Sequence, residues 1–218
     1  MCERTRVENA PFVQELCAQI LQITARRERT LVGIAGPPGA GKSTLTQALL
    51  EELAHNAPGV AVAVPMDGFH FDNRVLDARG LRARKGAEQT FDSTGYLHAL
   101  QRVRAGAADV AVPLFDRAGD FARAGAIVVE RRHRIVVSEG NYLLLDVEPW
   151  NELHALFDLT VYVDVPEAEL LRRLVQRWLD HGLPPAQAEA RARSNDLRNA
   201  RLVVEHSVAA DVTYTPDG

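Results

Sequence analysis

The sequence is poor in cysteine. Cys2 and Cys17 are the two cysteines among 218 residues, and both stand near the N-terminus. We therefore expect neither a disulfide framework nor a cysteine-rich metal site, because each needs more thiols. The sequence also lacks a signal-peptide pattern and any apolar run of about 18 residues, which favours a cytoplasmic protein with no membrane insertion.

An excess of positive charge is missing as well. The chain has 25 Lys and Arg against 29 Asp and Glu, a formal net charge of -4, and it has no polybasic block. Proteins that hold nucleic acid or a membrane surface by charge show the opposite balance, so neither partner is expected. With 46% hydrophobic and 25% charged residues, no repeat and no low-complexity linker, residues 1–218 are predicted to form a single domain.

The most informative stretch spans residues 31–50. A short apolar run precedes the segment Gly36-Pro37-Pro38-Gly39-Ala40-Gly41-Lys42-Ser43, and an amphipathic segment follows it. The pattern G-x-x-x-x-G-K-[ST] between a strand and a helix indicates a phosphate loop. An ordinary Gly/Pro turn is the alternative, but a plain turn requires neither Lys42 nor Ser43.

The residue types of this segment explain its expected chemistry. Glycines let successive backbone N–H groups turn toward an anion, and the following helix adds its positive dipole end. Lys42 can reach the β- and γ-phosphates of a nucleoside triphosphate, while the Ser43 hydroxyl ligates Mg²⁺. The residues predicted to bind the nucleotide are Gly36, Pro38, Gly39, Ala40, Gly41, Lys42, Ser43 and Thr44.

Apolar periodicity predicts the elements around this loop. Buried strands are expected at 31–35, 60–66, 134–140, 159–163 and 211–215, and helices at 8–29, 96–104, 167–181 and 186–206. Two short strands, at 110–114 and 127–130, would form a small β appendage within an insertion at about 71–130. Strands that alternate with helices predict a doubly wound α/β fold with a parallel sheet of about five strands.

Acidic residues follow three of the predicted strands. In such sheets ligands bind at the carboxyl ends of the strands, so Asp67, Glu139 and Asp164 are expected beside the phosphates. If the reaction is transfer to an alcohol, one acid accepts the hydroxyl proton and another helps to hold Mg²⁺. Asp67 is our candidate base, with a turn-capping aspartate as the alternative. Glu139 is preferred with Ser43 for the metal, because Asp164 fits better as an acid near the start of a helix.

Arginines gather in the last predicted helices. Arg172, Arg173 and Arg177 lie within 167–181, and Arg191 and Arg193 follow. In a kinase, an arginine over the γ-phosphate stabilises the transferring charge and excludes water. A solvated helix face is the alternative, and at most one of the adjacent Arg172 and Arg173 can face the phosphates. We predict a helical lid at about 167–195.

Several motifs occur in an order typical of one family. They are Gly36 to Ser43, Met66 to His70, Arg84-Lys85-Gly86, Thr90-Phe91-Asp92, Val136 to Asn141 and the arginine-rich helix. In these residues the chain resembles the P-loop kinases that include uridine kinase, phosphoribulokinase and bacterial pantothenate kinase. It looks most like the bacterial proteins called fructose transport system kinases or nucleoside kinase-like proteins. The resemblance covers about residues 30–214.

The resemblance implies ATP and Mg²⁺ as cofactors. It also implies that Asp67 is the catalytic base, that Asp92 binds sugar hydroxyls, that Glu139 lies on the Mg²⁺ side and that Arg173, beside Arg172 and Arg177, contacts phosphates. Phe115 stands where some relatives have a tyrosine, and residues 117–125 lack the histidine of uridine kinases. These two departures weaken the expectation of pyrimidine nucleoside recognition.

We therefore predict an ATP-dependent kinase that phosphorylates an alcohol group of a small hydroxylated metabolite, such as fructose. Lys42, Asp67 and Arg173 are its expected catalytic residues. Predicted acceptor contacts are His70, Lys85, Asp92, Asp116 and Asn141, and each of the first four could instead be a solvated loop residue. A pantothenate- or nucleoside-type kinase is an alternative within the class.

A regulatory ATPase without a small-molecule acceptor is the alternative of another class. The sequence contains no Asn-Lys-x-Asp guanine motif of a GTPase and no strand that ends in the adjacent Asp-Glu of a motor. The Asp67-Gly68-Phe69-His70 segment would have no evident role in either. The sequence is compatible with a homo-oligomer.

Overall fold

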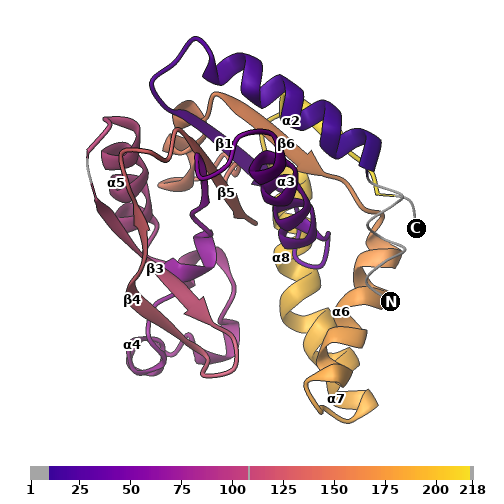
Figure 1. The fold of residues 1–218 in the computed structure, drawn as a ribbon. Helices are drawn as coiled ribbons and strands as arrows, with labels where there is room; N and C mark the ends of the chain where they lie inside the picture. The colour runs from indigo at the N-terminus through magenta and orange to yellow at the C-terminus, as the bar shows by residue number, and fades with distance from the viewer. Residues whose placement is uncertain (1–9, 108, 217–218) are drawn as a thin grey trace.

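A five-stranded parallel sheet forms the centre of the structure, a computed structural model that describes residues 10–107 and 109–216 (Figure 1). The strands are β1 (Thr30–Ala35), β2 (Ala61–Ala63), β5 (Ile135–Gly140), β6 (Leu159–Val163) and β7 (Val212–Tyr214). Their spatial order is β2-β5-β1-β6-β7, and every neighbouring pair is parallel. The predicted α/β fold with a parallel sheet is confirmed, with the phosphate-loop strand at its centre.

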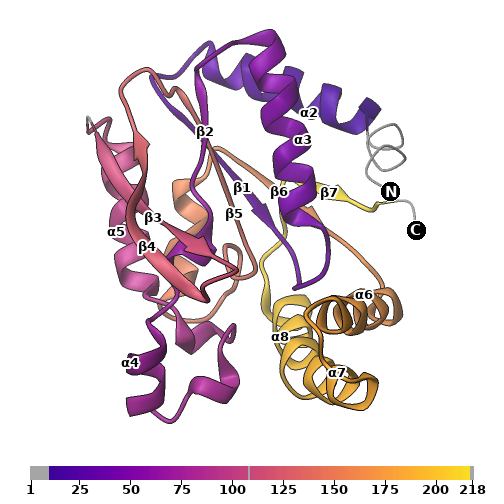
Figure 2. The ribbon, with the colours of Figure 1, turned by 60° about the horizontal axis from the view of Figure 1, so that its bottom comes forward.

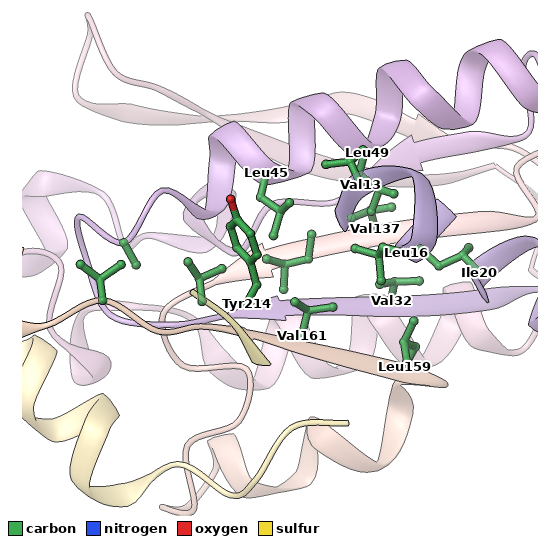
Figure 3. Packing of buried hydrophobic residues seen from close by; sticks show 14 of the residues in the cluster. Val13, Leu16, Ile20, Val32, Leu45, Leu49, Val137, Leu159, Val161 and Tyr214 are labelled. Carbon is green, nitrogen blue, oxygen red and sulfur yellow. The ribbon is translucent and has the colours of Figure 1, made fainter. Parts of the chain in front are cut away.

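Helices cover both faces of this sheet. Val32 and Ile34 of β1 belong to an apolar cluster shared with α2 (Ala10–Thr24) and α3 (Lys42–Asn56). Leu31 and Ala35 belong to a second cluster on the other face, shared with α5 (Ser93–Arg104). Figure 3 shows side chains of α2 and α3 over the strands in the first cluster. Burial on both faces explains why the core strands are continuous apolar runs.

Two groups of elements flank the loop that joins β1 to α3. One is the antiparallel hairpin of β3 (Val110–Asp116) and β4 (Phe121–Val129), together with α4 (Asn73–Ala78). The other contains α6 (Glu167–Asp180), α7 (Pro185–Arg191), a π-helical turn at Ala192–Asp196 and α8 (Leu197–His206). Figure 2 shows the two groups on opposite sides of that loop. The first group lies within the segment predicted as an insertion at about 71–130. The second overlaps the segment predicted as a lid at about 167–195 and continues beyond it into α8.

Several element bounds differ from the sequence-based ones. The strand predicted at 60–66 is reduced to β2, because Pro65 has no N–H for the ladder and a 3₁₀ turn, Met66–Phe69, follows it. The first helix ends at Thr24 instead of residue 29. The hairpin strands are longer than predicted, since cross-strand pairing continues toward the turn. The single helix predicted at 186–206 is interrupted by the π-helical turn.

The predictions about membranes and cysteines are only partly covered by the structure. Within residues 10–107 and 109–216, no helix is long and apolar enough to cross a membrane. Cys17 is free and packs in the cluster of α2 and α3, where burial raises the pKa of its thiol. Cys2 and the first two residues of the helix predicted at 8–29 lie outside the described residues.

Candidate active site

The glycines of the phosphate loop adopt conformations that other residues rarely take. Gly36, Gly39 and Gly41 have φ angles of 146°, 83° and 98°. A Cβ on Gly36 would lie 2.7 Å from the carbonyl oxygen of Val163 on β6, so the loop can leave the sheet at this point only with glycine. Gly41 is the N-cap of α3, which aims the N–H groups of the helix's first turn at the loop. This geometry favours an anion, as the sequence predicted.

Lys42 is buried beside the loop, with 7% of its surface exposed. Its Nζ donates hydrogen bonds to the carbonyl oxygen of Pro37 at 2.9 Å and to Asn141 Oδ1 at 2.6 Å. Burial lowers the pKa of Lys42 to about 8, although the nearby carboxylates of Glu139 and Asp67 act in the opposite direction. The ammonium group is therefore weakly hydrated, which strengthens its attraction for phosphate oxygens.

Glu139 lies next to the start of α3. It stands in β5, the neighbour of β1, and its Oε1 accepts a 3.1 Å hydrogen bond from the Ser43 hydroxyl. Burial raises the pKa of Glu139, and the negative charge of Asp67 adds to the effect. A divalent cation between Ser43 and Glu139 would offset both the burial of the Glu139 carboxylate and its repulsion by Asp67, because the charge of the cation stabilises the ionised carboxylate. The predicted pair for Mg²⁺ is thus brought together.

Asp67 lies in the 3₁₀ turn that follows β2. The turn can press against the β3–β4 hairpin because Gly68 has no side chain: a Cβ there would lie 2.3 Å from the Pro113 carbonyl oxygen. Asp67 Oδ2 accepts a 2.7 Å hydrogen bond from Arg117 Nη2, in an ion pair. No role for Arg117 was predicted from the sequence. Arg117 directly follows Asp116 in the predicted appendage, so the sequence does show a basic residue in the segment that forms the hairpin turn.

Aromatic rings form a wall beside Asp67. The His70 ring lies 4.0 Å from the Phe91 ring and 4.6 Å from the Phe115 ring, measured between centroids. Its Nδ1 is 2.7 Å from the Asp67 carbonyl oxygen. Burial lowers the pKa of His70, so the neutral imidazole is favoured and donates this bond. His70 therefore presents an uncharged, aromatic face to a ligand.

Lys85 is held in place by the hairpin turn. Its Nζ lies 2.8 Å from Asn73 Oδ1 and 2.8 Å from both the backbone oxygen and Oδ1 of Asp120. The ammonium group also lies 5.0 Å from the centre of the Phe115 ring. These contacts use the three donors of the ammonium group, so Lys85 fixes the turn as well as facing the cavity.

These residues share one cavity of about 670 Å³. Its lining includes the predicted residues Pro38, Gly39, Gly41, Lys42, Ser43, Thr44, Asp67, His70, Lys85, Glu139 and Asn141. Residues outside the predicted site also line it, among them Arg82, Phe91, Phe115, Arg117, Asp120, Trp178, Asp196 and Asn199. Ala40 and Gly36 are buried within the loop behind the lining.

Two predicted acceptor contacts do not line the cavity. Asp92 is the N-cap of α5 and accepts a 2.9 Å hydrogen bond from the N–H of Gly95. Asp116 accepts a 2.9 Å hydrogen bond from the N–H of Gly119 and lies 3.8 Å from Arg123. Both carboxylates thus serve local backbone structure, a common use of aspartate at helix starts and turns.

Asp164 lies shortly before α6, as expected, but its side chain does not cap that helix. The N-cap of α6 is Pro166, which offers no side-chain hydrogen bond. Asp164 is exposed, and its N–H donates a 2.8 Å hydrogen bond to the Tyr214 carbonyl oxygen, continuing the pairing of β6 with β7. Asp164 is not among the residues that line the cavity, whereas Glu139 is.

The arginines of α6 point in different directions. Arg172 is 68% exposed and pairs with Glu169. Arg173 also bonds Glu169, at 2.6 Å, and its Nη1 donates a 3.3 Å hydrogen bond to the carbonyl oxygen of Ala40 in the phosphate loop. Arg177 lines the cavity itself, as does Arg191 of α7. Arg173 therefore touches the loop backbone, while Arg177 and Arg191 face the ligand space.

A phosphate loop at the carboxyl edge of a parallel sheet, two acids at the ends of the neighbouring strands β5 and β2, and arginines of α6 and α7 in the same cavity define a P-loop phosphotransferase. Residues 32–182 match a family described as AAA domain. A Schizosaccharomyces pombe protein provisionally named a uridine kinase is 35% identical over 208 residues, covering 91% of this chain and 88% of the relative. The uncharacterized Escherichia coli protein YggC is 36% identical over 222 residues, covering 99% and 91%.

A solved structure gives the same assignment. The protein from Silicibacter, provisionally named a fructose transport system kinase, is 46% identical, with a TM-score of 0.83 over 93% of this chain and 98% of that one. The chain therefore belongs to the P-loop kinases of this family, which transfer phosphoryl groups to small molecules. The resemblance inferred from the sequence motifs is confirmed.

Proposed function

We propose that this protein transfers the γ-phosphate of ATP to an alcohol group of a small hydroxylated metabolite, such as a sugar, with Mg²⁺ as cofactor. The observation that carries the proposal is the position of Asp67, which lines the same cavity as Lys42 and Ser43. A carboxylate facing the phosphate loop across an open cavity suits a reaction with two substrates. A cytoplasmic location of the protein stays a prediction from its sequence.

The donor half of the proposed site consists of the phosphate loop and its neighbours. Lys42 and the loop N–H groups would hold the β- and γ-phosphates, and Ser43 and Glu139 would organise Mg²⁺. In the part of the chain that the structure describes, no group of three or more His, Cys, Asp or Glu could hold a metal ion. Two protein ligands suit Mg²⁺ in kinases, because the nucleotide phosphates and water supply the rest.

The chemical step follows from these positions. The acceptor hydroxyl oxygen attacks the γ-phosphorus, an O–P bond forms, and the bond from that phosphorus to the β–γ bridging oxygen breaks. ADP leaves with the electron pair of the broken bond, and Asp67 takes the hydroxyl proton. Arg177 and Arg191 would neutralise the charge on the transferring group and exclude water, while Arg173 would hold the loop.

An acceptor panel tests this function. The full chain is given MgATP labelled at the γ-phosphate, with fructose, other sugars, pantothenate or nucleosides, and both ADP release and labelled product are measured. Acceleration by an acceptor, with label in the acceptor, is the expected result. A Lys42→Met variant, which lacks the phosphate-binding ammonium group, serves as the inactive control. ADP release that no acceptor accelerates, with all label in inorganic phosphate, would overturn the proposal.

A further inference from the structure

The Asp67 carboxylate, which the proposed reaction uses as its base, forms an ion pair with Arg117 in the structure. One guanidinium nitrogen lies 2.7 Å from one carboxylate oxygen, and 53% of the Arg117 side chain is exposed against 24% of Asp67. An acceptor hydroxyl that is to give its proton to Asp67 must also lie within hydrogen-bond distance of this carboxylate. Arg117 and the acceptor hydroxyl therefore both need the Asp67 carboxylate, on which Arg117 holds Oδ2.

The backbone that carries Arg117 is firmly placed. The turn between β3 and β4 is closed by Asp116, which accepts a hydrogen bond from Gly119, and Asp120 takes a left-handed conformation with a φ angle of 56°. Asp120 is in turn bonded by Lys85 and by Asn73 at 2.9 Å. The guanidinium group can move through side-chain rotation alone, because the turn beneath it is fixed at both ends.

Lys85, Arg82 and Arg117 are the basic residues that the predicted insertion contributes to the cavity. Of these three, Arg117 has the ion-pair partner that an acceptor can replace. Lys85 and Asp120 neutralise each other at 2.8 Å, with the Lys85 side chain only 10% exposed. Arg82 lies at the longer distances of 3.5 Å from Asp77 and 3.7 Å from Asp120. Once the acceptor hydroxyl takes the place of Arg117 at Asp67, the guanidinium group faces the cavity without that carboxylate. Arg82, whose ion-pair distances are long, lines the same cavity.

We propose that Arg117 binds an anionic group of the acceptor, a carboxylate or a phosphate, and releases Asp67 when it does so. This inference rests on the proposed kinase function and narrows it to acceptors that carry both a hydroxyl and a negative charge. Guanidinium groups suit both anions, since their planar donors match two oxygens at once. The neutral His70, Phe91 and Phe115 rings would pack against the uncharged carbon skeleton of such a molecule.

Two matched pairs of ligands test the proposal and separate the two anions. Pantothenate is compared with its neutral alcohol, pantothenyl alcohol, and fructose 6-phosphate with fructose. The affinity of each for the full chain is measured by calorimetry with Mg²⁺ and a nonhydrolysable ATP analogue, and the KM and kcat of each are measured with MgATP. The variants are Arg117→Gln, Arg117→Lys and, as a control, Arg123→Gln. Arg123 is on the same hairpin, is 54% exposed and does not line the cavity.

The expected result is tighter binding of the charged member of at least one pair. In Arg117→Gln, its Kd and KM rise on the order of tenfold to a hundredfold, the loss expected for one charge-assisted hydrogen-bond contact. The neutral member and the KM for ATP change little, Arg117→Lys restores part of the affinity, and Arg123→Gln matches the unmodified protein. Preference for pantothenate identifies a carboxylate, and preference for fructose 6-phosphate identifies a phosphate.

Three kinds of result would overturn the inference. The first is that neither charged compound binds more tightly than its neutral partner. The second is that Arg117→Gln weakens both members equally or raises the KM for ATP, which would assign Arg117 to the transferring phosphate. The third is phosphorylation of a neutral member without any effect of Arg117→Gln, which refutes this inference and leaves the kinase proposal standing. Binding of a charged member that depends on Arg117, without transfer, supports this inference and counts against the kinase proposal.

Discussion

The Ser43 hydroxyl donates a 3.1 Å hydrogen bond to the carboxylate of Glu139, which lies 96 residues further along the chain. The parallel pairing of β1 with β5 places Ile34 beside Glu139, so the acid meets the start of α3 just beyond the end of β1. A hydroxyl and a carboxylate at this point form the part of the site best suited to a magnesium ion.

Replacing Glu139 by glutamine should raise the Mg²⁺ concentration needed for half-maximal turnover and lower kcat on the order of tenfold to a hundredfold, the size of effect seen for groups that tune a metal site. Asp164→Asn is the matched control, because Asp164 is exposed and does not line the cavity. Turnover as a function of Mg²⁺ concentration checks this. A larger effect of Asp164→Asn than of Glu139→Gln would assign the metal to Asp164.

Nucleotide affinity should fall as the pH rises through about 8. Burial lowers the pKa of Lys42 to about 8, and bound phosphates raise it because they stabilise the ammonium form. The protonated lysine binds the nucleotide. The nucleotide affinity should therefore be highest below about pH 8 and fall above it by up to about tenfold per pH unit. Titrations with ADP between pH 7 and 9.5 measure it. Lys42→Met should bind weakly and without this dependence, and a flat profile for the unmodified protein would contradict the assignment.

Arg177→Gln should lower kcat about a hundredfold, the usual loss on removing one donor to a developing charge. Arg172→Gln should leave kcat near its original value, because Arg172 is on the same helix but is 68% exposed and pairs with Glu169. Arg173→Gln should raise the Kd for the nucleotide more than it lowers kcat, since Arg173 contacts the loop at Ala40. Steady-state kinetics with a nucleotide titration distinguishes the three. Equal losses in all three variants would refute the assignment of Arg177.

Gly68→Ala should destabilise the protein by about 1–3 kcal/mol, as expected for overpacking. A Cβ at this position would lie 2.3 Å from the Pro113 carbonyl oxygen, and a backbone atom cannot move aside easily. Gly119→Ala is the control, because its Cβ would meet the Phe121 ring, which is 43% exposed and can rotate away. Urea unfolding of both variants measures the difference. Equal stability of the two would show that the turn carrying Asp67 does not depend on this contact.

The parts of the site that are contiguous in sequence could be predicted from it. The loop from Gly36 to Ser43 forms from neighbouring residues. Its glycine conformations and the hydrogen bond from Lys42 to the Pro37 carbonyl oxygen are local consequences of the motif. Asp67 and Glu139 could also be placed, because acids at the ends of parallel strands meet at one edge of the sheet.

Contacts that depend on tertiary geometry could not be predicted. Arg117 reaches Asp67 only because the hairpin packs on Gly68, and no local pattern reports that approach. Arg173 and Arg177 are four residues apart on one helix, and the docking of α6 decides which of them faces the cavity. Asp92 and Asp116 accept local backbone hydrogen bonds, which the sequence pattern did not predict, and their roles as acceptor contacts stay predictions.

The π-helical turn at Ala192–Asp196 has no sequence signal of its own, since neither Gly nor Pro marks it. It turns Asn195 inward, where Nδ2 donates a 3.0 Å hydrogen bond to the Lys85 carbonyl oxygen. A nearby arginine, Arg84, donates a 2.9 Å hydrogen bond to Asn199 Oδ1. These contacts join the π-helical turn and α8 to residues 84–85, and the helical stretch predicted at 186–206 contains this π-helical turn.

The central claim is that Asp67 accepts the proton of an acceptor hydroxyl during phosphoryl transfer. The most direct measurement is a comparison of Asp67→Asn with the unmodified protein for the acceptor that accelerates ADP release most. We predict that kcat for transfer falls on the order of a hundredfold to ten-thousandfold, the contribution of a general base, while the Kd for MgADP stays within about twofold. Unchanged transfer in Asp67→Asn, or a parallel loss of nucleotide affinity, would contradict the claim.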